Sequence, residues 1–538
     1  MEIEKKKEIV KLFIRNGILV TEDVLEILDK EEGCEKIIEQ IKNKINSKDF
    51  LILNSDLKTA LNLKDRLDVN FKELDKSKAL AESDKDSKTY PHFIDFLKSE
   101  EDNRIRKEEP IEDDSPVKVI FSYEEESKKR EVRDFVQYFS QRYKKISEML
   151  RGRSELQNIT SISRVLSKKE KDATAVIGLV TEKTITKNDN IRLTVEDMTG
   201  QISVLVSKNR PEIYGQAKDI VEDEVIGIVG VNGEKIIFAD NIIWPDIPAQ
   251  KELKKSPRES YAVFLSDLHV GSIKFLPNQL EKFLKWINCE IGNEKQKETA
   301  KKVRYCFITG DLVDGIGVYP DQEKELNILE IKQQYEECAK FLKKIPERVK
   351  LIIIPGNHDA MRLSEPQLPL YKDFAKSIWD LKNASILSNP AMVNIEATGD
   401  FPGFNCLLYH GYSFIYYADN VESIRQSGGI DRSDLIMKFW LKRRHLAPTH
   451  TSTLYIPDSA KDPLIIDKIP DLLITGHIHK AMIANYRNVT MICSSCWQEK
   501  TSYEEKLGLK PEPAKVPIIN LQTREVKILN FEMSEPSN

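Results

Sequence analysis

The C-terminal half of the chain alternates short apolar runs with polar turns in a pattern that predicts buried β-strands. Four such runs, most of them rich in β-branched residues, lead directly into turns that contain Asp, Asn, Gly or His. Apolar runs of about four to eight residues bounded by turn residues are typical of strands buried on both faces. We therefore expect an α/β domain over residues 251–538, with strands at residues 262–265, 306–309, 351–354 and 472–475.

A second pattern, five closely spaced strands, occupies residues 166–250. Turn residues separate the strands, as at Asn232-Gly233. Five strands within about 70 residues are typical of an OB-fold β-barrel. Such barrels often bind single-stranded nucleic acid on aromatic side chains, but aromatic residues are few here, so a purely structural barrel is an equal alternative. The predicted strands are residues 173–181, 191–196, 202–206, 225–231 and 235–243.

The N-terminal part of the chain divides into three segments of different character. Residues 1–50 place apolar residues at helical spacing and predict a small helical module. Residues 51–115 predict a polar linker, because most of the segment is dense in Lys, Glu, Asp and Ser and poor in large apolar residues. Residues 116–165 predict a lead-in that consists of a strand at 117–121 and an amphipathic helix at 132–150.

The polar turns of the C-terminal half carry the residue types that hold divalent metal ions. Only 8 histidines occur in the chain, and five of them lie in these turns. A single Asp-x-His or His-x-His after a strand is more often a solvated loop, but five such segments in one order make chance a poor explanation. Mixed imidazole and carboxylate ligands suit Mn, Fe, Zn or Ni better than Ca. The candidate ligands are Asp267, His269, Asp311, Asn357, His410, His477 and His479.

This set predicts a site for two divalent metal ions, with Mn favoured and Mg, Fe or Zn as alternatives. Two cations roughly 3.5–4 Å apart can clamp both the attacking and the leaving oxygen of a phosphodiester. One carboxylate must bridge them, and Asp311 is the expected bridge. The first site would be completed by Asp267, His269 and His479, and the second by Asn357, His410 and His477.

His358 is not needed as a ligand and is the candidate general acid. It could face the scissile phosphate and protonate the leaving oxygen, a role that positioned histidines often have. Either Asp314 or Asp359 could orient its ring. The alternatives for His358 are an eighth metal ligand or a packing residue.

Composition and charge limit the other function classes. The formal net charge of −5 gives no general basic character, so DNA binding would need local patches such as residues 301–304 and 442–445. Solvated helix faces are the commoner explanation of such charge runs. Cys493 and Cys496 lack a second cysteine pair, which favours core thiols over a zinc site. With no signal peptide and no apolar run of about 18 residues, we expect a cytoplasmic protein without membrane contact.

Taken together, the metal motifs resemble the calcineurin-like phosphoesterase superfamily. Residues 355–367, 437–448 and 469–479 are similar to the small subunit of archaeal family D DNA polymerases, and the resemblance covers roughly residues 160–535. It implies a four-layer αββα phosphoesterase domain and a metal-dependent 3′→5′ proofreading exonuclease. It also implies a large polymerising subunit and DNA with a 3′ end as partners, and it leaves open whether the sliding clamp is a third partner.

Three other function classes stay open at the level of sequence. A self-standing repair nuclease of the break-processing type would usually begin near its first metal motif, whereas Asp267 lies near the middle of this chain. A phosphoprotein phosphatase normally adds a phosphate-gripping arginine after the Asn-His pair, and Arg362 fits the polymerase pattern better. A non-enzymatic polymerase scaffold would have lost ligands, but here none is replaced.

Overall fold

The chain forms two compact units, residues 1–114 and 115–538. In the first unit, strands β1 (Ile18–Val20) and β2 (Leu51–Leu53) pair in parallel. The rest of the predicted helical module and of the predicted polar linker lies outside the described residues. The computed structural model describes residues 18–20, 51–53, 117–125, 129–168, 170–506 and 508–532.

The second unit contains two six-stranded sheets and a closed barrel. In spatial order, the strands of the first sheet are β12 (Ala384–Ile386), β11 (Lys350–Ile354), β10 (Val303–Thr309), β9 (Tyr261–Leu265), β18 (Lys515–Asn520) and β19 (Val526–Asn530). The strands β9 to β12 run parallel, and Cys306 lies beside both Val263 and Leu351 in their register. Strands β18 and β19 extend the sheet in the antiparallel sense. The three strands predicted in this sheet are confirmed.

The second sheet takes its edge strand from the predicted lead-in. In spatial order, its strands are β16 (Met482–Tyr486), β17 (Val489–Cys493), β15 (Leu472–Thr475), β14 (Phe404–Leu408), β13 (Ala391–Ile395) and β3 (Val117–Ser122). Strands β14, β15 and β17 are parallel neighbours, whereas β3 pairs antiparallel with β13. The predicted strand at 117–121 is thus confirmed, and it belongs to a sheet whose other strands all follow the barrel in sequence.

Alternation of side chains explains how the two sheets pack. In β9, Ala262 and Phe264 belong to one apolar cluster, whereas Val263 and Leu265 belong to another. The first cluster also contains Leu472 of β15, so it lies between the sheets, while the second lies on the outer face of the first sheet. A strand with both faces buried needs apolar residues at successive positions, which is why the predicted runs are continuous.

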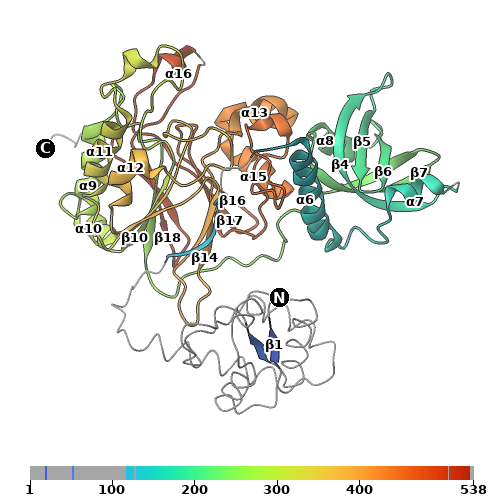
Figure 1. The fold of residues 1–538 in the computed structure, drawn as a ribbon, viewed down its shortest axis with the longest axis horizontal. Coiled ribbons are helices and arrows are strands. Elements are labelled where there is room, and N and C mark those ends of the chain that lie inside the picture. Colours follow the sequence, from blue (N-terminus) through green and yellow to red (C-terminus); the bar gives the residue numbers. More distant parts are fainter. Residues whose placement is uncertain are drawn as a thin grey trace, which may run out of the picture. The chain divides into compact units, whose positions relative to one another are not determined.

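Helices cover the outer faces of both sheets (Figure 1). The helices of this region are α9 (Pro277–Ile287), α10 (Glu294–Lys301), α11 (Ile331–Leu342), α12 (Lys372–Trp379), α13 (Phe414–Asn420), α14 (Glu422–Gln426), α15 (Ser433–Arg443) and α16 (Ser502–Lys506). α9 and α11 bury Phe283 and Tyr335 against the first sheet. α13 and α15 bury Tyr417 and Trp440 against the second.

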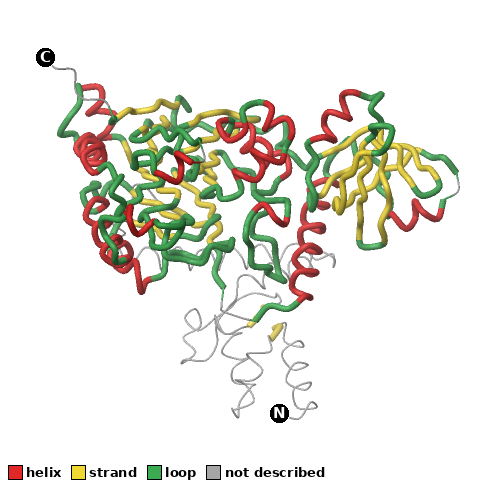
Figure 2. The backbone as a smooth tube through the Cα atoms, turned by 90° about the horizontal axis from the view of Figure 1, so that it is seen from above, coloured by secondary structure: helices red, strands yellow, loops and turns green. Residues whose placement is uncertain are grey.

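The closed barrel is formed by the five strands that the sequence predicts. They are β4 (Ala173–Ile185), β5 (Ile191–Asp197), β6 (Gly200–Val206), β7 (Val225–Gly233) and β8 (Ile236–Ile243). The spatial order is β4-β5-β6-β8-β7, and pairing of β4 with β7 closes the barrel. Helices α7 (Ile162–Ser167) and α8 (Pro211–Lys218) contribute Ile162 and Ile213 to its core. Figure 2 shows the barrel strands as a group apart from the two sheets.

Helix α6 (Val132–Arg151) lies in sequence between β3 of the second sheet and the barrel, and it confirms the predicted helix at 132–150. Its Arg142 is buried and pairs with Asp462 at 2.7 Å. Arg142 also donates to the carbonyl oxygen of Asp223 in the barrel at 3.4 Å. A buried ion pair is stabilising only if further hydrogen bonds offset the cost of desolvating its charges. Because the partners of Arg142 lie on both sides of α6, these contacts fix the position of the helix between them.

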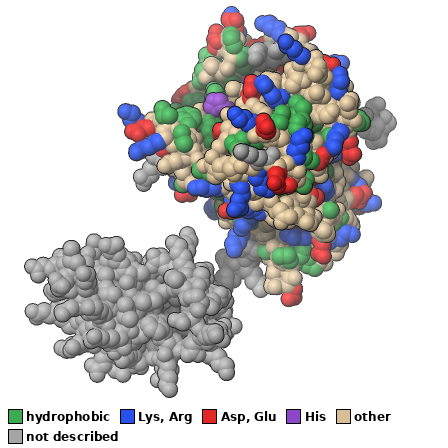
Figure 3. All heavy atoms as spheres, turned by 90° about the vertical axis from the view of Figure 1, so that its right-hand side faces the viewer, with side chains coloured by type: hydrophobic (Ala, Val, Ile, Leu, Met, Phe, Trp, Pro, Cys, Tyr) green, Lys and Arg blue, Asp and Glu red, His purple; other side chains and the backbone are tan. Residues whose placement is uncertain are grey.

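Residues 442–445 form neither the candidate basic patch nor a solvated helix face, because three of their four side chains are buried. Arg443 pairs with Glu224 of the barrel at 2.6 Å, and Nε2 of His445 lies 2.8 Å from Asp462. Both side chains are bound to carboxylates inside the fold, so they are not available to phosphates. Figure 3, which views the molecule from the barrel end, shows Lys and Arg interspersed with Asp and Glu on that face.

Two further expectations concern cysteines and membranes. Cys493 and Cys496 are both buried and neither is in a disulfide, as expected for core thiols. In the part of the chain that the structure describes, no helix has the length and apolar character that crossing a membrane requires.

Candidate metal centre

The seven candidate ligands lie just after the carboxyl ends of strands β9, β10, β11, β14 and β15. Turns at strand ends are where α/β sheets build their sites. Five of the ligands have a left-handed backbone, with φ between 49° and 73°. Non-glycine residues rarely adopt this region, and the cost, on the order of 1 kcal/mol or more each, is characteristic of functional sites. The five are Asp267, His269, Asp311, His477 and His479.

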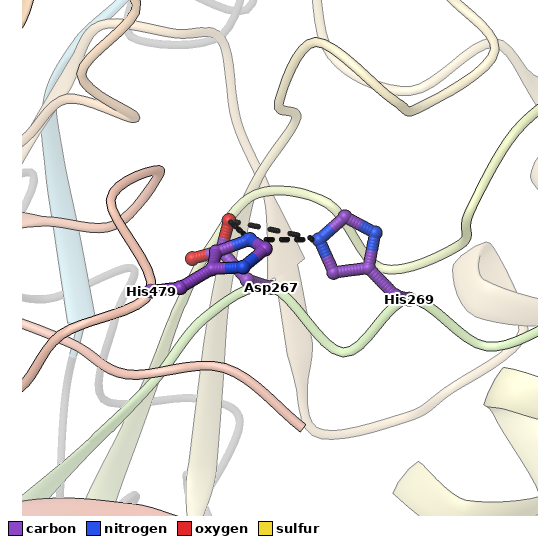
Figure 4. A group of neighbouring side chains, drawn as sticks. All are labelled: Asp267, His269 and His479. Atoms are coloured by element: carbon purple, nitrogen blue, oxygen red, sulfur yellow. Dashed lines mark hydrogen bonds and ion pairs between the residues drawn. The ribbon is translucent and has the colours of Figure 1, made fainter. Parts of the chain in front are cut away.

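Asp267, His269 and His479 form the first group of ligands, and their side chains point toward one another (Figure 4). Nε2 of His269 lies 3.1 Å from Nε2 of His479. The same two nitrogens lie 4.0 and 3.4 Å from Oδ1 of Asp267. Two imidazole nitrogens and a carboxylate oxygen therefore converge on one point, as metal ligands do.

Asp311, His410 and His477 form the second group, with ligand atoms within 4.8 Å of one another. Nε2 of His410 lies 3.4 Å from Oδ2 of Asp311 and 2.9 Å from Oδ1 of Asn357. The same Oδ2 of Asp311 lies 3.9 Å from Nε2 of His269 in the first group. Asp311 thus occupies the position between the two groups that a bridging carboxylate requires.

Three of the histidines are held from behind through Nδ1. A histidine whose Nδ1–H donates to an oxygen presents the lone pair of Nε2, and such outer partners fix the orientation of metal ligands. The three contacts are His269 to Oδ1 of Asp314 at 3.1 Å, His479 to Oε1 of Glu504 at 2.7 Å, and His410 to the carbonyl oxygen of Thr309 at 2.7 Å. This donor set, with Nε2 atoms and carboxylate oxygens facing a common space, fits divalent metal ions.

His358 lies beside both groups. Its backbone N–H donates to Oδ1 of Asp311 at 2.8 Å, and its ring lies edge-on to His269 with centroids 4.6 Å apart. Its Nδ1 lies 2.8 Å from the carbonyl oxygen of Asp314, which can only accept, so Nδ1 carries a proton. A ring nitrogen of His358 also lies close enough to Asp311 and His269 to share a metal ion with them. General acid catalysis by His358 stays a prediction.

Asp314 and Asp359 hold different parts of the centre. Asp314 contacts His358 through its main chain and His269 through its carboxylate. The carboxylate of Asp359 accepts instead from the backbone N–H of Gly356 at 2.8 Å, and burial raises its pKa to about 7. The structure therefore assigns the contact with His358 to Asp314, and it places Asp359 against the backbone of the loop that carries the ligand after β11.

Burial and charge oppose each other at this centre. Burial raises the pKa of Asp311, but the nearby charges of His410 and His358 outweigh it and hold that pKa well below the usual range. Burial lowers the pKa of His410, but the carboxylate of Asp311 raises it to about 9. Burial and the charge of His410 lower the pKa of His477 to about 3. Metal ions bind ionised carboxylates and neutral imidazoles, so in this group only His410 must release a proton at neutral pH.

Two glycines allow the ligand loops to approach each other. A Cβ atom at Gly356 would lie 2.2 Å from Oδ1 of Asp311, and one at Gly310 would lie 2.5 Å from Nδ1 of His410. Gly310 also has φ near 97°, a conformation that side chains rarely adopt. Any other residue at Gly356 would displace the candidate bridge.

Sequence motifs did not reveal three residues that support the ligands. Gln322 and Gln498 donate to the carboxylate of Asp314 at 2.9 and 3.1 Å. Glu504 lies on α16 and contacts His479. None of the three belongs to a strand-end turn with metal-ligand spacing, so neither periodicity nor motif pointed to them.

Glu504→Ala should weaken metal binding without removing a ligand. Loss of an outer partner of a metal-binding histidine typically costs about 10- to 100-fold in metal affinity, and Glu504 is such a partner of His479. Titration calorimetry with Mn²⁺ would measure the change. The matched control is Glu505→Ala, which removes an exposed carboxylate from the same helix. Equal affinities of the two variants would contradict the anchoring role.

The domain that carries the candidate ligands is similar to known phosphoesterases. Residues 262–481 match the family model described as calcineurin-like phosphoesterase. The chain is 36% identical over 401 residues to the DNA polymerase II small subunit of Methanothermobacter thermautotrophicus, covering 74% of this chain and 80% of that protein. Proteins of the same name from Methanocaldococcus jannaschii and Archaeoglobus fulgidus are 38% and 37% identical, covering 72% of this chain and 64% and 75% of those proteins. The chain therefore belongs to the family of archaeal DNA polymerase small subunits that its motifs resemble.

Proposed function

We propose that the chain is a metal-dependent 3′→5′ exonuclease that hydrolyses phosphodiester bonds at DNA 3′ ends, the proofreading activity of a family D polymerase. The observation that carries this proposal is the complete ligand set, arranged in two groups with Asp311 near a histidine of each. Two divalent cations, when bound there, would stabilise both the attacking and the leaving oxygen of the diester. The relatives are named as DNA polymerase subunits, which supports DNA as the substrate.

The residues of the centre would have two roles, binding of the cations and protonation of the leaving oxygen. Asp267, His269 and His479 would hold one cation, and Asp311 would face both. His358 would protonate the leaving 3′ oxygen. Because its Nδ1 is engaged by the carbonyl oxygen of Asp314, the proton that it transfers is at Nε2.

The domain architecture and the partners are part of the proposal. The strand order of the barrel supports an OB-fold at about residues 166–250, followed by a four-layer αββα domain. The names of the relatives support assembly with a large polymerising subunit, and the sliding clamp is a further candidate partner. Co-expression with that large chain should give a complex that stays intact on size-exclusion chromatography.

A phosphoprotein phosphatase is less well supported because of the position of Arg362. Its guanidinium donates to the carbonyl oxygen of Pro366 and pairs with Glu125 at 3.1 Å. An arginine engaged in this way is bound to the protein itself and would have to leave both partners to grip a phosphate.

The proposal is tested by incubating purified chain with 5′-labelled single-stranded DNA and Mn²⁺ or Mg²⁺. We expect stepwise shortening from the 3′ end. Excess EDTA should stop it, because EDTA removes the cations that the candidate ligands would hold. A phosphopeptide serves as the competing substrate. Full activity in EDTA, or release of phosphate from the peptide without shortening of the DNA, would contradict the proposed function.

A further inference from the structure

A pocket of about 580 Å³ opens at the candidate metal centre, and part of its lining is apolar. This volume lies within the range of about 300–1,000 Å³ that is usual for small-molecule sites. One part of the lining consists of candidate ligands, including Asp311 and His477. Another part is formed by Ile415 and Tyr416 of α13 together with Tyr412, which lies two residues before the helix; these three residues are called the α13 wall.

Packing of the fold does not explain the position of Ile415 in the α13 wall. Helix α13 buries Phe414 and Tyr417 in the core of the second sheet. Ile415 lies between them in sequence, yet 49% of it is exposed. A single exposed isoleucine would be unremarkable, but this one lines a cavity together with Tyr412 and Tyr416. An apolar surface inside a concave, polar site is the usual form of a ligand-binding wall.

The α13 wall begins directly beside the second group of ligands. The ring of Tyr412 lies 5.8 Å from the ring of His477, with their planes inclined by 43°. His477 in turn belongs to the group with Asp311 and His410. A phosphodiester placed at these ligands would therefore have its attached nucleoside within reach of the wall.

We propose that the α13 wall binds the base of the 3′-terminal nucleotide by stacking and apolar contact. The inference rests on the proposed exonuclease activity and adds the residues that contact the terminal base of its substrate. Every base has a flat π-face, so such a contact serves all four bases and contributes on the order of 5- to 100-fold in affinity per base.

The experiment compares two single-stranded oligonucleotides that differ only at the 3′ end. One ends in thymidine, and the other ends in an abasic tetrahydrofuran residue. For the full chain with Mn²⁺, we expect kcat/KM to be roughly 5- to 100-fold higher for the thymidine end. Ile415→Ala and Tyr412→Ala should bring this ratio close to one, whereas Tyr412→Phe keeps the ring and should keep the ratio.

The matched control is Ile185→Ala, which truncates an isoleucine that is 71% exposed at the end of β4 in the barrel. It should leave the ratio at the wild-type value. Metal content is measured on each preparation, because Tyr412 lies next to a ligand. A wild-type ratio of one, or an unchanged ratio in Ile415→Ala with normal metal content, overturns the role of the wall. If the wild-type chain removes neither terminus, the proposed exonuclease fails as well, and the two failures are distinguished.

Discussion

Asp311→Ala should abolish the exonuclease and empty both metal sites together. Oδ2 of Asp311 lies 3.4 Å from Nε2 of His410 and 3.9 Å from Nε2 of His269, so one carboxylate faces both groups of ligands. Without it, buried imidazoles would face each other with no shared negative charge, which is unfavourable for cation binding. We expect a rate loss of more than about 10³-fold. Metal analysis by mass spectrometry and the 3′-end assay, on the same preparation, would measure both effects.

The control for this variant is Asp419→Ala, which removes an exposed carboxylate from the lining of the same pocket. It should keep both ions and most of the activity. Asp314→Asn should have an intermediate effect, because Asp314 contacts His269 and His358 and is not one of the candidate ligands. Two cations still bound per chain in Asp311→Ala would show that another group is the bridge.

The strands of this fold could be predicted because their signal is local. A strand such as β15 is buried throughout, is apolar at its first three positions and is followed by a glycine and a histidine, so a few residues suffice to locate it. Strand pairing could not be predicted in the same way. The edge strand β3 pairs with β13, and the whole barrel lies between them in sequence. Such a contact depends on which exposed edge is left in the folded sheet.

In the candidate site, too, residues with a local sequence signal could be predicted and residues without one could not. The seven proposed ligands were predicted because His, Asp and Asn recur after strands, and the structure brings them close together. Their anchors were missed because a main-chain carbonyl such as that of Thr309 has no sequence signature, and Glu504 is one of many glutamates. The burial within residues 442–445 could not be predicted either, because it depends on a distant part of the chain. Whether Arg443 faces solvent or Glu224 is decided by the barrel, which the local sequence does not contain.

His358→Ala should lower the exonuclease rate while keeping both metal ions. The ring of His358 is held in place by the carbonyl oxygen of Asp314 at 2.8 Å, and the backbone N–H of His358 donates to the carboxylate of Asp311. Substitution of the side chain leaves that backbone contact intact, so the bridge should keep its position. Positioned acid catalysis is typically worth about 10²–10⁴-fold in rate. We therefore expect a loss of this size in kcat, with little change in affinity for single-stranded DNA.

The control is His450→Ala, which removes an exposed histidine that contacts Tyr455 away from the candidate ligands. It should change neither rate nor metal content. In His358→Ala, loss of a metal ion would identify the residue as an eighth ligand, since its ring nitrogen lies close to Asp311 and His269. An unchanged rate with both ions bound would remove it from the mechanism. Only a rate loss with both ions retained fits a proton donor, because a ligand and a packing residue each predict one of the other two outcomes.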